Sequence, residues 1–390
     1  MYIWSYGGKA MARTARGEVF EATEVGVYHV YNRVVRRCFL WGVDPVSGKD
    51  FSYRQGIVVR RLRLLSQYFA LEVLGYAVLS NHFHLVVRNR PDRVASWSDR
   101  QVAWRWLMIC PAKRHPDESP VEPTEAQLAV LLADPEKLQE LRRRLSNPSW
   151  LMGRACQYIA RRCNREDQHA GRFFEERFKM KRLLDEAAVL ACLAYVDLNP
   201  LRAGATDRLD GEAEVSIAER MRQLDGSSAT PADWLVPMED PKPPPQAPVP
   251  CPEEVESAAG AKPAEAAAPN HPSPSGEQAS ADPSASRGTL PFDLRSYVEL
   301  LGWLAAGDAT EAASQQQPRE GPQGDEGPTG KLLPERLGLD ATAFAAAVRD
   351  YERRFRTVVG GPASVERERR RRRRKRLHAP GRGDLNPRSS

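Results

Sequence analysis

The sequence predicts an α+β fold in which a sheet carries helices on one face. Residues 24–40 are rich in Val, Tyr and Phe and partly alternate, which is typical of a strand. Between residues 53 and 74 the apolar side chains recur at helical spacing. Two β-rich runs follow, at 71–80 and 82–88, separated by Asn81. A strand, a helix and two adjacent strands make half of an α+β sandwich.

Residues 91–150 are predicted to be an insertion. They contain a polar, proline-bearing loop and a helix over about 125–145, which ends in the amphipathic run LQELRRRL.

The second half of the fold follows the insertion. We expect a helix over 150–165, a loop leading into a strand over 171–184, and a helix over 185–199. Asp185 is the expected N-cap of that last helix, and Pro200 is expected to stop it.

The composition changes after Leu235. From 241 to 287 the chain is Pro, Ala, Glu and Ser with almost no large apolar residues, so we expect it to be disordered. Apolar periodicity returns at 292–306 and 332–359. The predicted segments are an N-terminal extension (1–23), a main α+β domain (24–210) that includes the insertion, a mostly disordered Pro/Ala-rich linker (211–290), a small helical module (291–361) and a basic, unfolded tail (362–390).

The basic residues are bunched. The formal net charge is +6, but Arg and Lys concentrate at 60–63 and at 367–376. Polyanions such as nucleic acid are the usual partners of that pattern. A solvated tail is the alternative for the second run.

Several features indicate a cytoplasmic protein. The six cysteines include no CxxC pair, which favours reduced thiols over disulfides or a zinc site. The N-terminus lacks the features of a signal peptide. Because no apolar stretch approaches the length needed to cross a bilayer, we expect no membrane partner.

The sharpest motif is His82-Phe83-His84. On a strand, residues two apart point to the same face, so the two imidazoles would project together. Paired imidazoles could bind a divalent metal. The alternative is a half-buried strand with two incidental histidines.

A second motif is AYVDLNPLRAG, at 194–204. On a helix, Tyr195 and Asn199 lie one turn apart and share a face. Tyr195 could supply a phenolic nucleophile, and the Asn199 amide oxygen a third metal ligand. The alternative is a helix that ends at Asn-Pro, with Tyr195 packed against the sheet.

Together the two motifs suit phosphodiester chemistry. That reaction needs an in-line nucleophile and a cation on the non-bridging oxygens. A covalent phosphotyrosine conserves the energy of the broken bond, so rejoining needs no ATP. The sequence has no GxxxxGK[ST] pattern, in agreement with this.

Four segments, in this order, resemble the single-tyrosine HUH transposases, and above all the REP-associated tyrosine transposases related to the insertion-sequence-200 type. They are YHVYNRVVRRCF, GYAVLSNHFHLVVR, GRFFEERFKMKRLL and LAYVDLNPLRAGA. The resemblance implies that His82, His84 and Asn199 bind Mg²⁺ or Mn²⁺ and that Tyr195 is the nucleophile. It also implies a ferredoxin-like or RRM-like sheet and a single-stranded or hairpin DNA substrate. It is compatible with a homodimer and with a monomer.

Further residues are weaker candidates. Phe173, Phe174 and Phe178 could stack on bases, although core packing is the more common role. His29 is expected to be structural, and Tyr28 and Tyr31 are weak rivals for the nucleophile. The basic residues that could contact DNA phosphates are Arg33, Arg36, Arg37, Arg60, Arg61, Arg63, Arg177 and Lys179.

Two other functions stay open at this point. The chain could bind hairpin DNA or RNA on the same fold without catalysis. It could also be a metal-dependent hydrolase that uses the histidines and not Tyr195.

Overall fold

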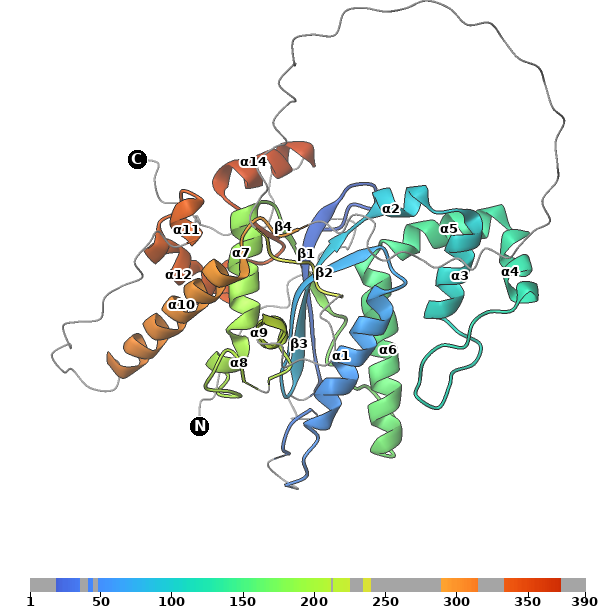
Figure 1. The fold of residues 1–390 in the computed structure, drawn as a ribbon, viewed down its shortest axis with the longest axis horizontal. Coiled ribbons are helices and arrows are strands. Elements are labelled where there is room, and N and C mark those ends of the chain that lie inside the picture. The colour runs from blue at the N-terminus through green and yellow to red at the C-terminus, as the bar shows by residue number, and fades with distance from the viewer. Residues whose placement is uncertain are drawn as a thin grey trace, which may run out of the picture.

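The protein has a mixed α+β architecture built on a five-stranded sheet (Figure 1). The computed structural model describes residues 19–35, 41–44, 48–211, 213–224, 234–239, 289–314 and 333–372. Within them, no helix is both long and apolar enough to cross a membrane. The strands are β1 (Gly26–Arg33), β2 (Leu71–Val78), β3 (His82–Asn89), β4 (Lys179–Leu183) and β5 (Val358–Val359). The helices of the first half are α1 (Tyr53–Ser66), α2 (Pro91–Ser96), α3 (Asp99–Ile109), α4 (Glu125–Leu132), α5 (Pro135–Leu145) and α6 (Pro148–Glu166). The later helices are α7 (Glu186–Asp197), α8 (Asn199–Arg202), α9 (Ser216–Leu224), α10 (Leu294–Ser314), α11 (Leu333–Arg336), α12 (Ala341–Arg349), α13 (Tyr351–Arg354) and α14 (Pro362–Arg371).

The strands lie in the order β2-β3-β1-β4-β5. The first four are antiparallel to their neighbours, and β5 pairs with β4 in parallel. The expected first strand begins as predicted, but β1 ends at Arg33, and residues 36–40 lie outside the described part of the chain.

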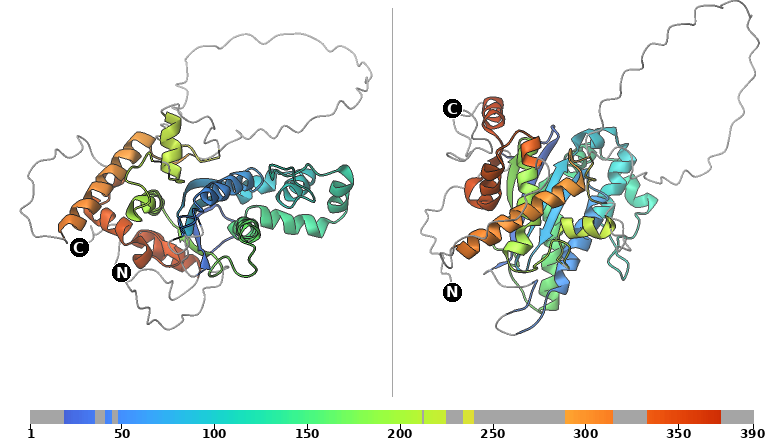
Figure 2. Two further views of the ribbon diagram at one scale, coloured as in Figure 1. Left: turned by 90° about the horizontal axis from the view of Figure 1, so that it is seen from below. Right: turned by 60° about the vertical axis from the view of Figure 1, so that its left-hand side comes forward.

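Helices cover both faces of the sheet, which corrects the prediction of a single covered face. The helices α1 and α6 pack on one face and α7 on the other (Figures 1 and 2). Strand β2 is buried along its whole length, with Val73 facing the α1 side and Leu74 the α7 side. An apolar run of this kind is typical of a strand covered on both sides.

The N-cap expected for helix α7 is confirmed, because the Asp185 side chain accepts a hydrogen bond from the Ala188 backbone N–H.

Helix α7 packs close to β2 because position 75 is a glycine. A Cβ at Gly75 would lie 2.6 Å from Leu193 Cδ2, a distance at which one of the two must move. The expected stop at Pro200 is wrong in detail, since this proline lies in the first turn of the short helix α8.

The insertion forms four helices where one was expected, and the predicted proline-bearing loop lies between α3 and α4. The single helix expected over 125–145 is divided into α4 and α5. Asp134 caps α5 through the Lys137 N–H, and Pro135 takes the first position. A proline lacks the N–H that a continuous helix would need there.

The C-terminal segments belong to the main fold. Residues 216–224, assigned to the linker, form α9, which packs on β2, and Leu235 bridges to Val73. The predicted separate module is also integrated: α12 and α13 pack on α7, and β5 extends the sheet. The rest of the predicted disordered linker, from 240 to 288, lies outside the described residues.

The basic tail begins as a helix, which corrects the prediction of an unfolded tail from 362. In α14 the Glu366 carboxylate lies beside Arg369 and Arg370, and Glu368 beside Arg371. Such pairs three and four residues apart stabilise a helix. Residues 373–390 lie outside the described part of the chain.

Candidate active site

Three neighbouring strands place reactive side chains on the α7 face of the sheet. In the register of β3, β1 and β4, His84 lies opposite Tyr31, and Tyr31 lies opposite Lys179. One step along, His29 lies opposite Lys181. Because residues two apart share a face, His29 and Tyr31 point the same way.

Helix α7 adds the tyrosine. The Tyr195 ring meets the His84 ring edge-on, with 5.5 Å between centroids. The Asn199 amide Nδ2 lies 3.2 Å from His84 Nε2. Tyr195, Asn199 and His84, far apart in sequence, therefore lie together as their motifs predict.

His82 stands at the edge of this group. Its ring centroid is 5.0 Å from that of His84, so the two imidazoles do project to one face. Its Nδ1 atom lies 2.7 Å from the Oδ1 atom of Asn81.

A third histidine, His29, contacts His84 directly. The Nε2 atom of His29 lies 2.9 Å from His84 Nδ1, and the two rings stack. His29 is completely buried, and its Nδ1 atom has no hydrogen-bond partner among the described residues. From the sequence we expected His29 to be structural. Its place in the site could have been predicted only from the register between β1 and β3.

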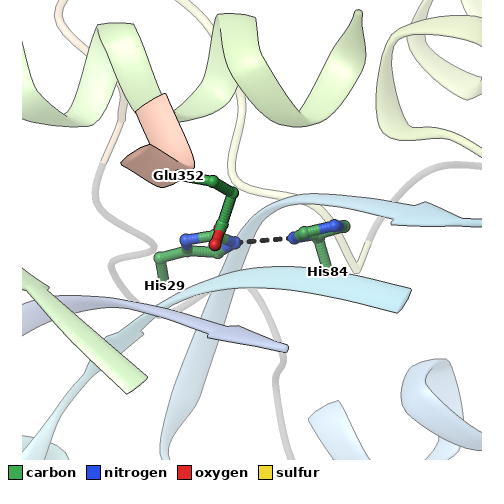
Figure 3. A group of neighbouring side chains, drawn as sticks. All are labelled: His29, His84 and Glu352. Carbon is green, nitrogen blue, oxygen red and sulfur yellow. Dashed lines mark hydrogen bonds between the residues drawn. The ribbon is translucent and has the colours of Figure 1, made fainter. Parts of the chain in front are cut away.

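A carboxylate reaches the same group from α13. Glu352 Oε2 accepts a hydrogen bond of 3.0 Å from Tyr31 Oη, and its Oε1 lies 3.1 Å from Lys181 Nζ. One ligand atom from each of His29, His84 and Glu352 lies within 4.8 Å of the others (Figure 3). No sequence pattern pointed to Glu352, because it follows Tyr31 by 321 residues.

Tyr351, which precedes Glu352 in α13, packs on Tyr195. The rings of Tyr351 and Tyr195 stack with centroids 4.7 Å apart and planes inclined by 18°. Tyr351 is fully buried. Helix α13 therefore covers one face of the Tyr195 ring, and Tyr195 is half-buried.

Burial keeps these groups neutral. It lowers the pKa of His84 to about 3, with help from the Lys181 ammonium, and the pKa of His82 to about 2, with help from His84. Burial also holds the pKa of His29 well below its usual value. Burial and then the Glu352 carboxylate raise the pKa of the Tyr195 phenol. At neutral pH the imidazoles can donate lone pairs, and the phenol keeps its proton.

The donor set of this cluster fits a divalent cation. Two neutral imidazoles and a carboxylate are ligands that Mn²⁺ and Mg²⁺ accept, and the unpartnered His29 Nδ1 leaves a buried lone pair or N–H unused. The Asn199 amide lies beside the same histidine.

The residues expected to contact DNA divide into three groups. Arg60, Arg177 and Lys179 are exposed, and Arg33 is half-buried. Arg61 is buried, at 5% exposed, and Arg63 pairs with Glu219. Arg36 and Arg37 lie outside the described residues.

The phenylalanines belong mainly to the core. Phe173 and Phe178 are buried in the cluster under α1 and α6. Phe174 is partly buried and meets the Trp41 ring. The core interpretation is thereby confirmed for the two buried rings.

No protein-family model matches the chain, and neither does any curated protein. A solved structure described as a REP-associated tyrosine transposase bound to a REP hairpin is similar to it, with 10% sequence identity and a TM-score of 0.29. The match covers 55% of this chain and 88% of the other. The relation is distant, and no function follows from it.

Proposed function

We propose that this protein is a metal-dependent single-tyrosine transposase that cuts and rejoins single-stranded DNA at hairpin-forming repeats. The observation that carries the proposal is the meeting of Tyr195, His84 and Asn199. A potential nucleophile, a neutral imidazole and an amide lie within one contact shell. These are the parts that in-line attack on a phosphodiester requires.

In the proposed reaction the Tyr195 oxygen forms a bond to phosphorus as the phosphorus–O3′ bond breaks. The phenol loses its proton, and the departing 3′ oxygen gains one. The products are a 5′-phosphotyrosine and a free 3′-hydroxyl. Attack by the 3′-hydroxyl of another strand reverses the step and restores the phenol. The neighbouring Asn199 amide opposes the rise in the Tyr195 pKa.

A divalent cation would supply positive charge to the non-bridging oxygens of the scissile phosphate. His84 is common to both candidate ligand sets, which are His82, His84 and Asn199 from the sequence and His29, His84 and Glu352 from the side-chain cluster. Titration with Mn²⁺ by calorimetry separates them. His84→Ala should abolish binding under either set, whereas Glu352→Gln weakens it only if the cluster holds the ion, and Asn199→Ala only if the amide does.

The arrangement of the first four strands supports the proposal. The order β2-β3-β1-β4, with α1 and α6 on one face, is the arrangement that a ferredoxin-like sheet has. Helix α7, which carries Tyr195, packs on the opposite face against β2 and β3.

The test is a covalent adduct. The purified chain is incubated with Mn²⁺ and labelled DNA hairpins that have single-stranded flanks, and the products are run on a denaturing gel. The wild type should give a protein–DNA band that Tyr195→Phe loses while it still binds the hairpin. Tyr31→Phe is the matched control, because Tyr31 also stacks on His84 but should keep the adduct. Cleavage that survives in Tyr195→Phe and is lost in His82→Ala would favour the hydrolase.

One observation favours a second candidate, a hairpin-binding protein without catalysis. Tyr351 stacks on Tyr195 and limits access to that ring. The variant Tyr351→Ala removes this cover. If neither the wild type nor Tyr351→Ala forms an adduct on any hairpin, while both bind it, the binding function replaces the catalytic one.

A further inference from the structure

A buried arginine on the other side of the sheet has no ion-pair partner in the described part of the chain. Arg61 on α1 is 5% exposed, and its Nε atom has no hydrogen-bond acceptor among the described residues. Its guanidinium lies over the ring of Tyr158, 4.6 Å from the centroid. An aromatic face offsets only part of the cost of removing a cation from water.

Arg54, two turns earlier on the same helix, shows the usual arrangement. It is also buried, but its Nε lies 3.1 Å from Glu166 Oε2, and its Nη2 lies 2.5 Å from Asp167 Oδ1. Buried charges are normally paired in this way. Arg61 differs from Arg54 in lacking an acidic partner among the described residues, so a bound anion could take that place.

The surroundings of Arg61 are cationic and hollow. It lines a pocket of about 380 Å³ between α1, the end of α3 and α6. Among the described residues, the pocket has one carboxylate, Glu118, which lies 3.5 Å from Arg162. The arginines that line the pocket are Arg61, Arg114, Arg154, Arg161, Arg162 and Arg165.

Burial and the neighbouring cations disfavour the charged form of Arg61. Burial, and then the Arg114 cation, lower the pKa of Arg61 to about 10. A bound anion would oppose both effects, because it supplies the missing hydrogen-bond acceptors and the missing charge.

The pocket continues along α6. A second hollow, of about 670 Å³, shares Gln157, Arg161 and Arg165 with the first and extends to Asn164 and His169. A free phosphate needs one pocket. A nucleic-acid strand needs a track that accepts successive phosphates and offers polar groups to its bases, and the two joined hollows fit this better.

We propose that the Arg61 pocket binds a backbone phosphate of a nucleic-acid strand, which continues along α6. Arg61 is the buried anchor, and Arg161 and Arg165 guide the strand at the surface. The site lies on the α1 and α6 face, opposite the face that carries Tyr195 and His84. It does not depend on the reaction proposed for that second face.

The test uses the full chain without added metal, so that no strand is cut. Thermal unfolding is followed with increasing inorganic phosphate, and fluorescence anisotropy measures the affinity for a labelled dT oligonucleotide of about twelve nucleotides. Arg61→Met keeps the apolar stem and removes the charge. The control is Arg143→Gln, an exposed arginine of α5 that does not line the pocket.

Phosphate should raise the melting temperature of the wild type and not that of Arg61→Met, which unfolds at the same temperature as the phosphate-free wild type or higher. Arg61→Met should bind the oligonucleotide about tenfold more weakly, which corresponds to one lost charged contact. The slope of log affinity against log salt should fall by about 0.7. Arg143→Gln should stay near the wild type.

Unchanged affinity of Arg61→Met for both probes would overturn the proposal. If the phosphate effect disappears but oligonucleotide binding does not, the pocket takes free phosphate, and the nucleic-acid part is wrong. If Arg61→Met does not fold, the exposed pair Arg161→Ala and Arg165→Ala decides by the same measurements. Tyr195→Phe should behave as the wild type here, so failure of the adduct assay leaves this result intact.

Discussion

The contact between Gly75 and Leu193 sets how closely the tyrosine helix approaches the sheet, and Gly75→Ala tests it. The added Cβ would lie 2.6 Å from Leu193 Cδ2 and 3.1 Å from Ser216 Oγ. Leu193 is completely buried, so it has no open space to turn into. Helix α7 must therefore move away from β2 or the core must strain.

Overpacking of this kind costs about 1–3 kcal/mol. For a fold of this size that corresponds to a fall in melting temperature of roughly 2–4 °C per kcal/mol. Thermal and urea unfolding measure the change. Because α7 carries Tyr195, adduct formation should fall as well.

A second substitution shows whether Leu193 is the cause. Leu193→Ala alone should cost about 2–5 kcal/mol. The double variant should cost less than the sum by about 0.5–3 kcal/mol, because the smaller side chain makes room for the Cβ. Gly302→Ala is the control, since this exposed glycine of α10 has no atom within 4 Å of its Cβ position and should stabilise the helix slightly. Strict additivity would refute the reasoning.

Three further predictions concern other buried groups. Burial raises the pKa of the Asp197 carboxyl. The contribution of this group to stability is therefore present in acid and declines as the pH rises through that raised pKa. The difference in unfolding free energy between the wild type and Asp197→Asn should shrink over the same pH range. Arg54→Met removes the ion pair of Asp167 and one of the two arginines beside Glu166, and should cost about 2 kcal/mol in urea unfolding, whereas the same change at Arg61 should cost nothing. Burial raises the pKa of the Cys192 thiol to about 12, so its thiolate fraction should be roughly a thousandfold below that of an ordinary cysteine. Peptide mapping after alkylation should find Cys192 unmodified in the wild type and modified in Tyr351→Ala, and equal labelling in both would contradict the docking of α13.

Local patterns predicted the elements that meet at the site. The HxH spacing placed two imidazoles on one face of β3, and the spacing of Tyr195 and Asn199 placed both on one face of a helix. Spacing alone does not bring the two motifs together in space. The expectation that they meet came from the order of the four segments, through the fold that their resemblance implied. Periodicity also found α1, α6 and β4.

The remaining members of the site come from long-range pairing. His29 looks like any strand residue until the register sets it beside His84. Glu352 lies in a short helix with no motif, and only the docking of α13 makes it a neighbour of Tyr31. Propensity and spacing carry no information on such contacts.

Charge patterns were misread in two places for opposite reasons. The run after Arg367 suggested an unfolded tail, but Glu366 and Glu368 stand at the spacing that pairs with arginines on a helix. Arg61 suggested a surface cation, but the helix turns it toward the insertion, where it is buried.

The hydrogen bond between Tyr31 and Glu352 joins positions 321 residues apart. Contacts of such separation form late, because closing so long a loop costs entropy before the contact repays it. A chain in which strands β1 to β4 and α7 have already assembled, but α13 has not yet arrived, would present the Tyr195 ring to solvent. In such a chain the Tyr195 ring would lack the Tyr351 ring that stacks on it in the finished fold.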